Sequence, residues 1–280
     1  MEDEFLKAID GIAERQRSAY PEVEGDYRVD GILYCGKCKT PKEKEYPIPW
    51  ADTKKILPVL CKCQKEQYQI DQENLKKADF KMQVDRLRRE GITDSKYLSC
   101  SFDNDDSPKE KNSVICRRYA SKFSEIEKKN IGLLLYGDVG TGKTFYAACI
   151  ANYLLGKCIP ASITNFPDLL SLIFKDKDAI AKLQSFSLLV IDDLGVERNS
   201  EYSMEQIYNV IDARVRSGKP MIVTTNLSAT ELTRPGDLAH KRIYDRIMEA
   251  CPVMIKFEGN SRRGVKACQK AAEAKKILGV

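Results

Sequence analysis

Apolar side chains recur with helical spacing in three separate stretches of the chain, which predict three amphipathic helices. The first covers about residues 3–18, and the second runs from 64 to 90 without a Pro or Gly. The third lies between Ile115 and Ile126 and precedes a continuous apolar run. A final lysine-rich stretch, 265–278, shows a helical pattern with alanines.

Continuous apolar runs alternate with further helical patterns in the second half of the chain. Such runs are typical of strands that are buried on both faces of a parallel sheet. The predicted strands are 131–136, 159–163, 186–191 and 220–225, and the predicted helices are 145–155, 167–174, 179–183 and 203–217. This alternation predicts an α/β fold with a mostly parallel sheet flanked by helices.

A polar connection from about Gly91 to Lys111 follows the long second helix. We therefore expect a small helical N-terminal domain over residues 1–95 and a larger domain over residues 96–280. The chain of 280 residues is long enough for this division, and its net charge of +5 is too small to establish nucleic-acid binding by itself. Its apolar runs are too short to span a bilayer, and its acidic start lacks a signal-peptide pattern, so a cytoplasmic protein is expected.

A glycine-rich turn joins the first predicted strand to the helix after it. Its residues are Gly137, Asp138, Val139, Gly140, Thr141, Gly142, Lys143 and Thr144, with Phe145 opening the helix. They fit the phosphate-loop pattern, in which backbone N–H groups and the helix N-terminus face phosphate oxygens. Lys143 can reach the β- and γ-phosphates, and the Thr144 hydroxyl can hold Mg²⁺. The sequence therefore predicts an ATP·Mg²⁺ site here rather than a turn that binds nothing.

Polar side chains follow the last two of these apolar runs, 186–191 and 220–225. Asp192 and Asp193 follow one strand, and Asn226 follows another. The carboxyl ends of such strands face the ligand crevice of an open α/β sheet. We expect Asp192 to hold Mg²⁺, Asp193 to orient or deprotonate the attacking water, and Asn226 to bond the γ-phosphate or that water. Taken alone, the two acids would fit a helix cap equally well.

Four of the ten cysteines are clustered, as Cys35-x-x-Cys38 and Cys61-x-Cys63. Two such pairs can complete a tetrahedral four-sulfur zinc site, which would stabilise a segment with little apolar material. Four unliganded thiols are the alternative, and a redox-active first pair is disfavoured because no thioredoxin-like strand and helix surround it. The six scattered cysteines are expected to pack as small hydrophobes, and the single histidine, His240, is assigned no role.

The phosphate loop, the acid-tipped strand and the Thr-Thr-Asn-Leu strand end resemble the DnaC/DnaI/IstB group of AAA+ ATPases over about residues 98–263. The likeness is greatest to the DnaC/DnaI-type replicative helicase loaders. It implies that Asn226 is the sensor-1 residue, that Arg246 is the arginine finger with Arg242 as its partner, and that Arg263 is a sensor-2 residue. It also implies that the cysteine-rich region binds a helicase. Many AAA+ proteins have Asp-Glu where this chain has Asp192-Asp193, which puts the strength of water activation in doubt.

The resemblance implies an ATPase with slow, regulatory turnover that binds single-stranded DNA, delivers a replicative helicase and self-associates through its AAA+ modules. ATP, Mg²⁺ and Zn²⁺ are the expected cofactors. A transposition-helper ATPase of the IstB type is the first alternative, since the same catalytic residues would serve. A zinc-stabilised binding adaptor with a degenerate nucleotide site is the second.

Overall fold

The computed structural model describes residues 2–48, 53–176, 178–195, 201–262, 271–272 and 274–279. It separates into two compact units, Met1–Phe80 and Lys81–Val280. The division falls within one continuous helix, α2 (Lys62–Gly91), which confirms the long helix predicted over 64–90. The functional boundary near residue 95 stays a prediction.

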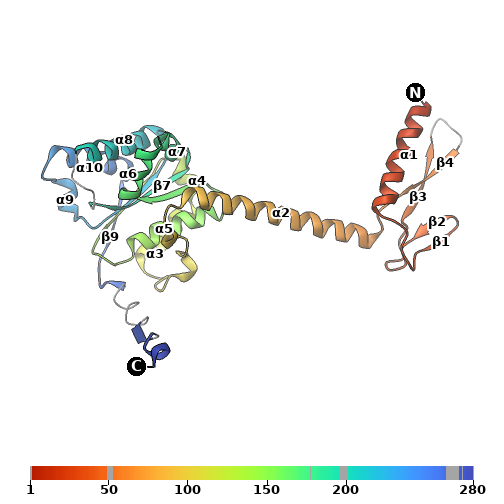
Figure 1. Cartoon of the computed structure of the whole chain (residues 1–280), viewed down its shortest axis with the longest axis horizontal. Coiled ribbons are helices and arrows are strands. Elements are labelled where there is room, and N and C mark those ends of the chain that lie inside the picture. The colour runs from red at the N-terminus through yellow and green to blue at the C-terminus, as the bar shows by residue number, and fades with distance from the viewer. Residues whose placement is uncertain are drawn as a thin grey trace. The chain divides into compact units, whose positions relative to one another are not determined.

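The N-terminal unit combines helix α1 and the first part of α2 with two small antiparallel hairpins (Figure 1). Helix α1 spans Glu2–Ala19, close to its predicted bounds. The first hairpin pairs β1 (Tyr27–Val29) with β2 (Ile32–Tyr34), and the second pairs β3 (Glu43–Ile48) with β4 (Thr53–Pro58). None of these strands was predicted, because their residues are largely exposed and lack a clear apolar alternation.

The second unit is built on a five-stranded sheet with the order β6-β7-β8-β5-β9, in which all pairings are parallel. The strands are β5 (Leu133–Gly137), β6 (Ala161–Asn165), β7 (Leu188–Leu194), β8 (Met221–Thr225) and β9 (Val253–Phe257). Four of them confirm predicted strands to within a few residues, and the edge strand β9 was missed. The carboxyl ends of β5, β7 and β8 therefore meet at one edge of the sheet.

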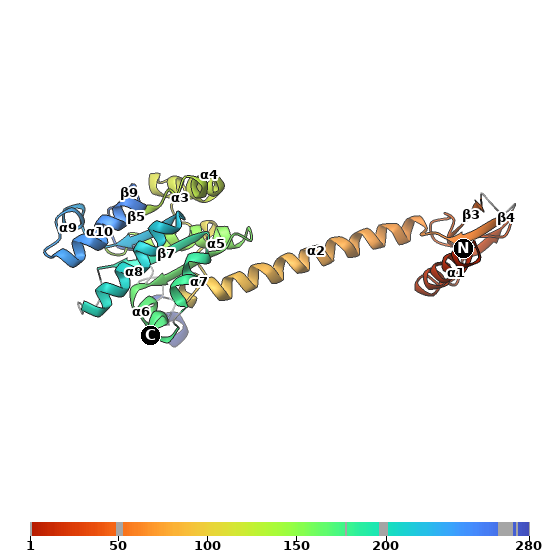
Figure 2. The same cartoon turned by 90° about the horizontal axis from the view of Figure 1, so that it is seen from above.

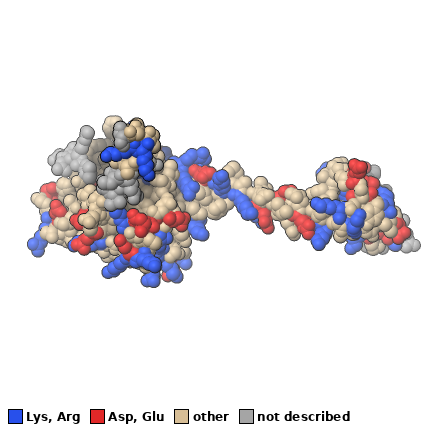
Figure 3. Space-filling view, turned by 90° about the horizontal axis from the view of Figure 1, so that it is seen from below, with Lys and Arg blue, Asp and Glu red and all other residues tan. Residues whose placement is uncertain are grey.

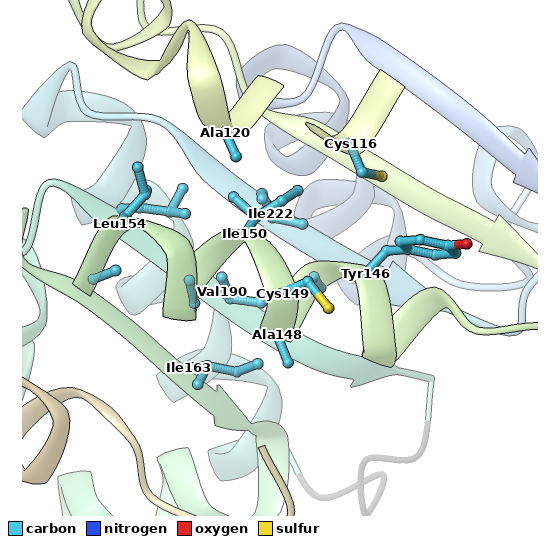
Figure 4. Close-up of a cluster of buried hydrophobic side chains, with 14 of the residues drawn as sticks. Cys116, Ala120, Tyr146, Ala148, Cys149, Ile150, Leu154, Ile163, Val190 and Ile222 are labelled. Atoms are coloured by element: carbon cyan, nitrogen blue, oxygen red, sulfur yellow. The ribbon is translucent and has the colours of Figure 1, made fainter. Parts of the chain in front are cut away.

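Helices cover both faces of this sheet (Figures 1 and 2). On one face, α5 (Lys143–Leu155) and α3 (Lys111–Ser121) pack with the end of α2 against Leu133, Val190 and Ile222. Figure 4 shows this core, with α5 side chains such as Ile150 and Leu154 directed at the sheet. The other face is covered by α6 (Phe166–Lys175), α7 (Ala179–Ser185), α8 (Glu201–Ser217) and α10 (Leu238–Ala250). Successive β5 residues face opposite clusters, as expected for a strand buried on both sides.

The connection after α2 is more ordered than its polar sequence suggested. It contains two short 3₁₀ turns, η1 (Ser95–Tyr97) and η2 (Phe102–Asn104), each with a buried aromatic side chain. The single helix expected between residues 115 and 126 is broken at Lys122 into α3 and α4 (Phe123–Lys128). A short helix, α9 (Ala229–Thr233), was also missed.

Apolar side chains recur every seven residues along α2, at Tyr68, Leu75 and Met82, but this heptad stripe does not form a buried seam. Tyr68, Leu75 and Met82 are each at least half exposed, whereas Val84 and Leu87 near the end of the helix are buried. Of the helix predicted over 265–278, residues 271–272 and 274–278 are described and are helical, whereas Cys268 and Arg263 lie outside the described residues. In the described part of the chain, no helix combines the length and the apolar character needed to cross a membrane.

Candidate functional site

The phosphate loop forms the turn between β5 and α5, where its glycines adopt backbone conformations that other residues avoid. Gly137 and Gly140 have φ values of 120° and 80°. A Cβ atom added at Gly137 would lie 2.2 Å from Phe257 O, and one added at Gly140 would lie 2.1 Å from the Ser261 hydroxyl oxygen. The Thr141 hydroxyl closes the loop by donating to Asp138 O at 2.7 Å. The loop therefore needs glycine both for its curvature and for the close approach of neighbouring segments.

Lys143 is buried at the first turn of α5, with its ammonium group directed at the loop. Its Nζ donates to the carbonyl oxygens of Gly137 and Asp138, at 2.8 and 2.6 Å. The next residue, Thr144, donates its hydroxyl to Asp192 Oδ1 at 2.7 Å. The sequence predicted that Lys143, Thr144 and Asp192 lie in one site, and in the structure they do lie together at the phosphate loop.

Asp192 is a buried carboxylate that accepts hydrogen bonds from three hydroxyl groups. Oδ1 accepts from Thr144 and from Thr224 on β8, at 2.7 and 2.6 Å, and Oδ2 accepts from Tyr97 at 3.1 Å. Burial, followed by the charge of Asp192, raises the pKa of the Tyr97 phenol, so Tyr97 remains a donor. The Tyr97 contact was not predicted.

The backbone of Asp193 departs from the extended conformation of the strand that contains Asp192. Its φ of 60° lies in the left-handed region, and the pairing of β7 with β8 shifts register between Ile191 and Leu194. The Asp193 N–H donates to the Thr224 hydroxyl at 3.0 Å, and the amide Nδ2 of Asn226 lies 3.4 Å from Asp193 Oδ1. This irregularity places Asp193 and Asn226 in one pocket, while Asp192 stays buried beside Thr144.

That pocket, of about 220 Å³, lies beside the phosphate loop. It is lined by Cys100, Asn104, Asp106, Gly140, Gly142, Lys143, Thr144, Phe145, Asp193, Asn226 and Arg262. The first three come from the connection after α2 and were missed, because nothing in their local sequence distinguishes them from a polar linker.

Arg262 is the arginine that reaches this pocket among the described residues. Its N–H donates to Gly140 O at 3.0 Å, and its guanidinium pairs with Asp106 and Glu110 at 2.5 and 2.9 Å. The family resemblance pointed to the adjacent Arg263, which lies outside the described residues. Arg262 is therefore an additional candidate for contact with a bound nucleotide.

The donor set fits a nucleotide with its metal ion. The loop N–H groups and the N-terminus of α5 suit phosphate oxygens, and Lys143 supplies a cation. Thr144 and Asp192 offer hard oxygen ligands of the kind that Mg²⁺ prefers.

Arg246 and Arg242, on α10, lie against α8. Arg246 pairs within its own chain, with Asp212 Oδ1 at 3.3 Å and Glu249 Oε2 at 2.8 Å. The Arg242 guanidinium lies 4.9 Å from the ring centre of Tyr208. The structure thus places both arginines on one surface and does not bring either into the pocket.

The four clustered cysteines meet in the N-terminal unit. Their sulfur atoms all lie within 4.8 Å of one another, and Cys63 Sγ is 3.4–3.6 Å from the other three. A tetrahedral zinc site with Zn–S bonds of about 2.3 Å requires sulfur separations of roughly 3.8 Å. The cluster therefore fits a zinc ion with little movement of the chain.

The thiols influence each other's ionisation. A hydrogen bond from Thr40 contributes most to lowering the pKa of Cys38 to about 5, whereas the three neighbouring sulfurs raise the pKa of Cys63 to about 12. Four thiolates at these distances repel one another unless a cation lies between them. This electrostatic conflict supports a metal-binding role.

A buried ion pair supports the first cysteine turn. Asp26 Oδ2 accepts from Lys42 Nζ at 2.6 Å, and Asp26 Oδ1 accepts from the Gly36 N–H at 2.9 Å. Burial would raise the pKa of Asp26, but the hydrogen bonds from Lys42, Gly36 and Val23 outweigh it and lower the pKa to about 2. Neither residue was singled out from the sequence, because charged residues in such a segment are normally solvated.

A parallel sheet with a phosphate loop after β5, paired acids ending β7 and an asparagine after β8 defines a nucleotide-binding P-loop fold of the AAA+ class. The family model described as "IstB-like ATP binding protein" matches residues 69–271, and the chain belongs to this family.

Curated relatives are replication proteins. The chain is 29% identical over 214 residues to "Replicative helicase loader DnaC" of Buchnera aphidicola subsp. Schizaphis graminum, covering 71% of this chain and 83% of that protein. It is 27% identical over 209 residues to the protein of the same name from Escherichia coli K12, covering 71% and 84%. The recognition of a DnaC/DnaI/IstB-type AAA+ protein is thereby confirmed.

Solved structures agree on the fold. A crystal structure of DnaI matches with a TM-score of 0.52 at 24% identity, covering 62% of this chain and 99% of that chain. A putative primosome component from Streptococcus pyogenes serotype M3 matches with a TM-score of 0.51 at 21% identity, covering 63% and 97%.

Proposed function

We propose that this protein is an ATP-dependent loader of a replicative DNA helicase, which binds ATP with Mg²⁺ and single-stranded DNA. The observation that carries the proposal is the convergence of Lys143, Thr144, Asp193 and Asn226 on one pocket, with Asp192 bonded to Thr144 behind it. The loader role rests on relatives that bear this name and that the chain matches over more than four-fifths of their length.

The chemistry we propose is slow transfer of the γ-phosphoryl group to water. Lys143 exchanges the two loop carbonyls for phosphate oxygens, and Thr144 and Asp192 hold Mg²⁺. The bound metal ion neutralises charge that develops on the phosphate oxygens. Asp193 orients the attacking water or takes its proton, and Asn226 fixes the same water or the γ-phosphate.

Nucleotide turnover provides the first test. Wild-type protein should hydrolyse ATP, and Lys143→Ala should lose binding and turnover because the phosphates lose their cation. Lys157→Ala removes an exposed lysine just beyond the other end of α5 and should match wild type. The assay is run with and without single-stranded DNA, whose binding would change the rate. A wild-type protein that binds ATP but turns it over no faster than Lys143→Ala would favour the adaptor with a degenerate site.

Self-association is part of the proposal, with Arg246 acting on the nucleotide of a neighbouring copy and Arg242 as its partner. A head-to-tail contact of this kind generates rings or open spirals. Arg246 would have to leave Asp212 and Glu249 to do so. Arg246→Ala should bind ATP and hydrolyse it poorly, and mixing it with Lys143→Ala protein should restore some turnover. Arg216→Ala, which also loses a partner of Asp212, is the matched control and should keep full turnover. Failure of the mixture to recover would exclude a finger acting in trans.

We further propose that residues 1–95 form the helicase-binding domain, with Cys35, Cys38, Cys61 and Cys63 holding one zinc ion, and that residues 96–280 form the ATP-binding domain. The geometry of the four sulfurs supports the metal, and the separate compact unit supports an independent docking role. On the face shown in Figure 3, basic and acidic side chains are interspersed rather than gathered by sign.

An IstB-type transposition helper is the second candidate, favoured by the description of the matching family model. The cysteine-bearing unit favours the loader, because it provides a separate module for docking. Pulldown with purified replicative helicase and with purified transposase distinguishes them. Binding to transposase alone would reject the loader function while leaving the ATPase site intact.

A further inference from the structure

Tyr97 connects the segment that enters the ATP-binding unit to the carboxylate of Asp192. Its side chain is completely buried in η1, and its hydroxyl donates to Asp192 Oδ2 across a separation of 95 residues in sequence. Because Oδ1 faces the hydroxyls of Thr144 and Thr224, hydroxyl groups hold both oxygens of this carboxylate.

The segment that carries Tyr97 is fixed to the edge of the sheet. A Cβ atom at Gly91 would lie 2.1 Å from Ala161 O, so the end of α2 approaches β6 without room for a side chain. Ile92 forms a parallel bridge with Ile163, and the Thr93 hydroxyl donates to Ile163 O at 3.2 Å. The path from α2 into η1 therefore follows the edge strand.

A second anchor comes from the phosphate-loop helix. The Asn152 amide on α5 donates to Tyr97 O at 2.7 Å and to Cys100 O at 2.8 Å. The side chain of Asp94 caps η1 by accepting from the Lys96 N–H. Contacts with the edge strand β6 and with helix α5 thus both hold the segment that carries Tyr97. They fix the position of its phenol relative to Asp192.

We propose that Tyr97 is a positioning residue for the magnesium site, whose hydroxyl fixes the rotation of the Asp192 carboxylate so that Oδ1 faces Thr144. This inference rests on the proposed function, because it takes Thr144 and Asp192 as the residues that hold Mg²⁺. Groups that orient a metal ligand tune metal affinity without touching the ion. Tyr97 thereby makes the junction after α2 part of the nucleotide site.

The alternative is a phenol that satisfies its hydrogen bond in the core and has no effect on the metal. Tyr97→Phe separates the two roles, because it keeps the ring and removes the hydroxyl. The matched control is Tyr119→Phe, which removes another buried hydroxyl, bonded to Ile131 O at 2.8 Å and not to Asp192.

The measurement is ATP binding, followed with a fluorescent ATP analogue, first in EDTA and then in a Mg²⁺ titration. Mg²⁺ is expected to raise the affinity for ATP, and the Mg²⁺ concentration that gives half of this increase is the quantity compared. We expect this concentration to be about tenfold higher in Tyr97→Phe than in wild type. Its binding in EDTA should equal that of wild type, and Tyr119→Phe should match wild type in both conditions.

Three outcomes would overturn the inference. One is an unchanged Mg²⁺ requirement in Tyr97→Phe. The second is an equal loss of binding with and without Mg²⁺, which would show a general structural role. The third is a wild-type protein that binds ATP without any response to Mg²⁺, which would reject the magnesium site itself and so distinguish failure of the proposed function from failure of the role of Tyr97.

Discussion

The two compact units are stabilised in different ways. In the ATP-binding unit, two large clusters of buried apolar side chains lie on opposite faces of one sheet. In the described part of the N-terminal unit, the buried apolar side chains are Ala13, Leu33, Cys35 and Cys61, and the charged residues Lys42 and Glu43 are buried as well. A segment with so little apolar burial cannot offset its loss of conformational entropy by packing alone. In the smaller unit, a buried charge pair and a cluster of four cysteines that could hold a metal ion therefore stand where the larger unit has an apolar core.

Removal of zinc gives the largest expected effect, confined to the N-terminal unit. Structural zinc sites contribute on the order of 10 kcal/mol to folding. Wild type should contain about one zinc per chain, and Cys35→Ser/Cys38→Ser should contain none and lose hydrogen-exchange protection in β1–β4. Cys158→Ser, outside the cluster, should keep its zinc. A metal-free protein whose hairpins keep full hydrogen-exchange protection would show that the N-terminal unit does not depend on zinc for its stability.

A mutation that creates a cavity in the core of the ATP-binding unit is expected to cause the next largest loss of stability. Ile150→Ala, at a completely buried position on α5, should lower the free energy of unfolding of that unit by about 2–5 kcal/mol. Zinc content and exchange in the N-terminal hairpins should not change. Phe174→Ala, at a position that is 80% exposed, is the control and should have little effect. Loss of zinc from Ile150→Ala would show that the two units do not depend on separate interactions.

The Asp26–Lys42 pair should give a smaller loss within the N-terminal unit. Lowering of the Asp26 pKa from 3.8 to about 2 corresponds to at most about 2 kcal/mol of stability, because nearby solvent screens the charge pair. This contribution is complete above about pH 5 and is lost progressively as the pH falls through 3.8 and then through the folded value of about 2, because the carboxylate must be charged. Asp26→Asn should therefore destabilise the unit by the same amount at pH 6 and pH 8, as measured by hydrogen exchange of β1–β4.

The exposed pair of Lys54 and Glu45 provides the matched control, since both side chains are about half exposed or more. Glu45→Gln should cost less than about 1 kcal/mol. Equal losses of stability in Asp26→Asn and Glu45→Gln would mean that burial does not strengthen the contribution of the Asp26–Lys42 pair.

The sequence predicted the ATP-binding unit well because its signals are local. The phosphate loop requires glycine, lysine and threonine at fixed spacing, and strands buried on both faces leave continuous apolar runs such as Leu188–Ile191. The polar residues that follow these runs meet at one sheet edge because parallel strands end there together. The roles assigned to Asp193, Asn226 and Arg246 stay predictions.

The remaining features depend on contacts between residues that are distant in the chain. Tyr97 and Arg262 reach the site from segments whose sequence resembles a linker or a loop. The N-terminal strands escaped prediction because exposed strands such as β1 carry no apolar alternation. The error in α2 is the opposite one, since its apolar spacing predicts an amphipathic helix with a buried face although Tyr68, Leu75 and Met82 are exposed.

The left-handed backbone at Asp193 limits which acid can occupy that position. Asparagine and aspartate tolerate such a conformation better than longer or branched side chains do. Glutamate, common at this place in other AAA+ proteins, would add conformational strain together with its extra methylene. The short acid therefore suits the bend in β7, and a glutamate at this position would have to hold the left-handed conformation at a cost of up to about 1–2 kcal/mol.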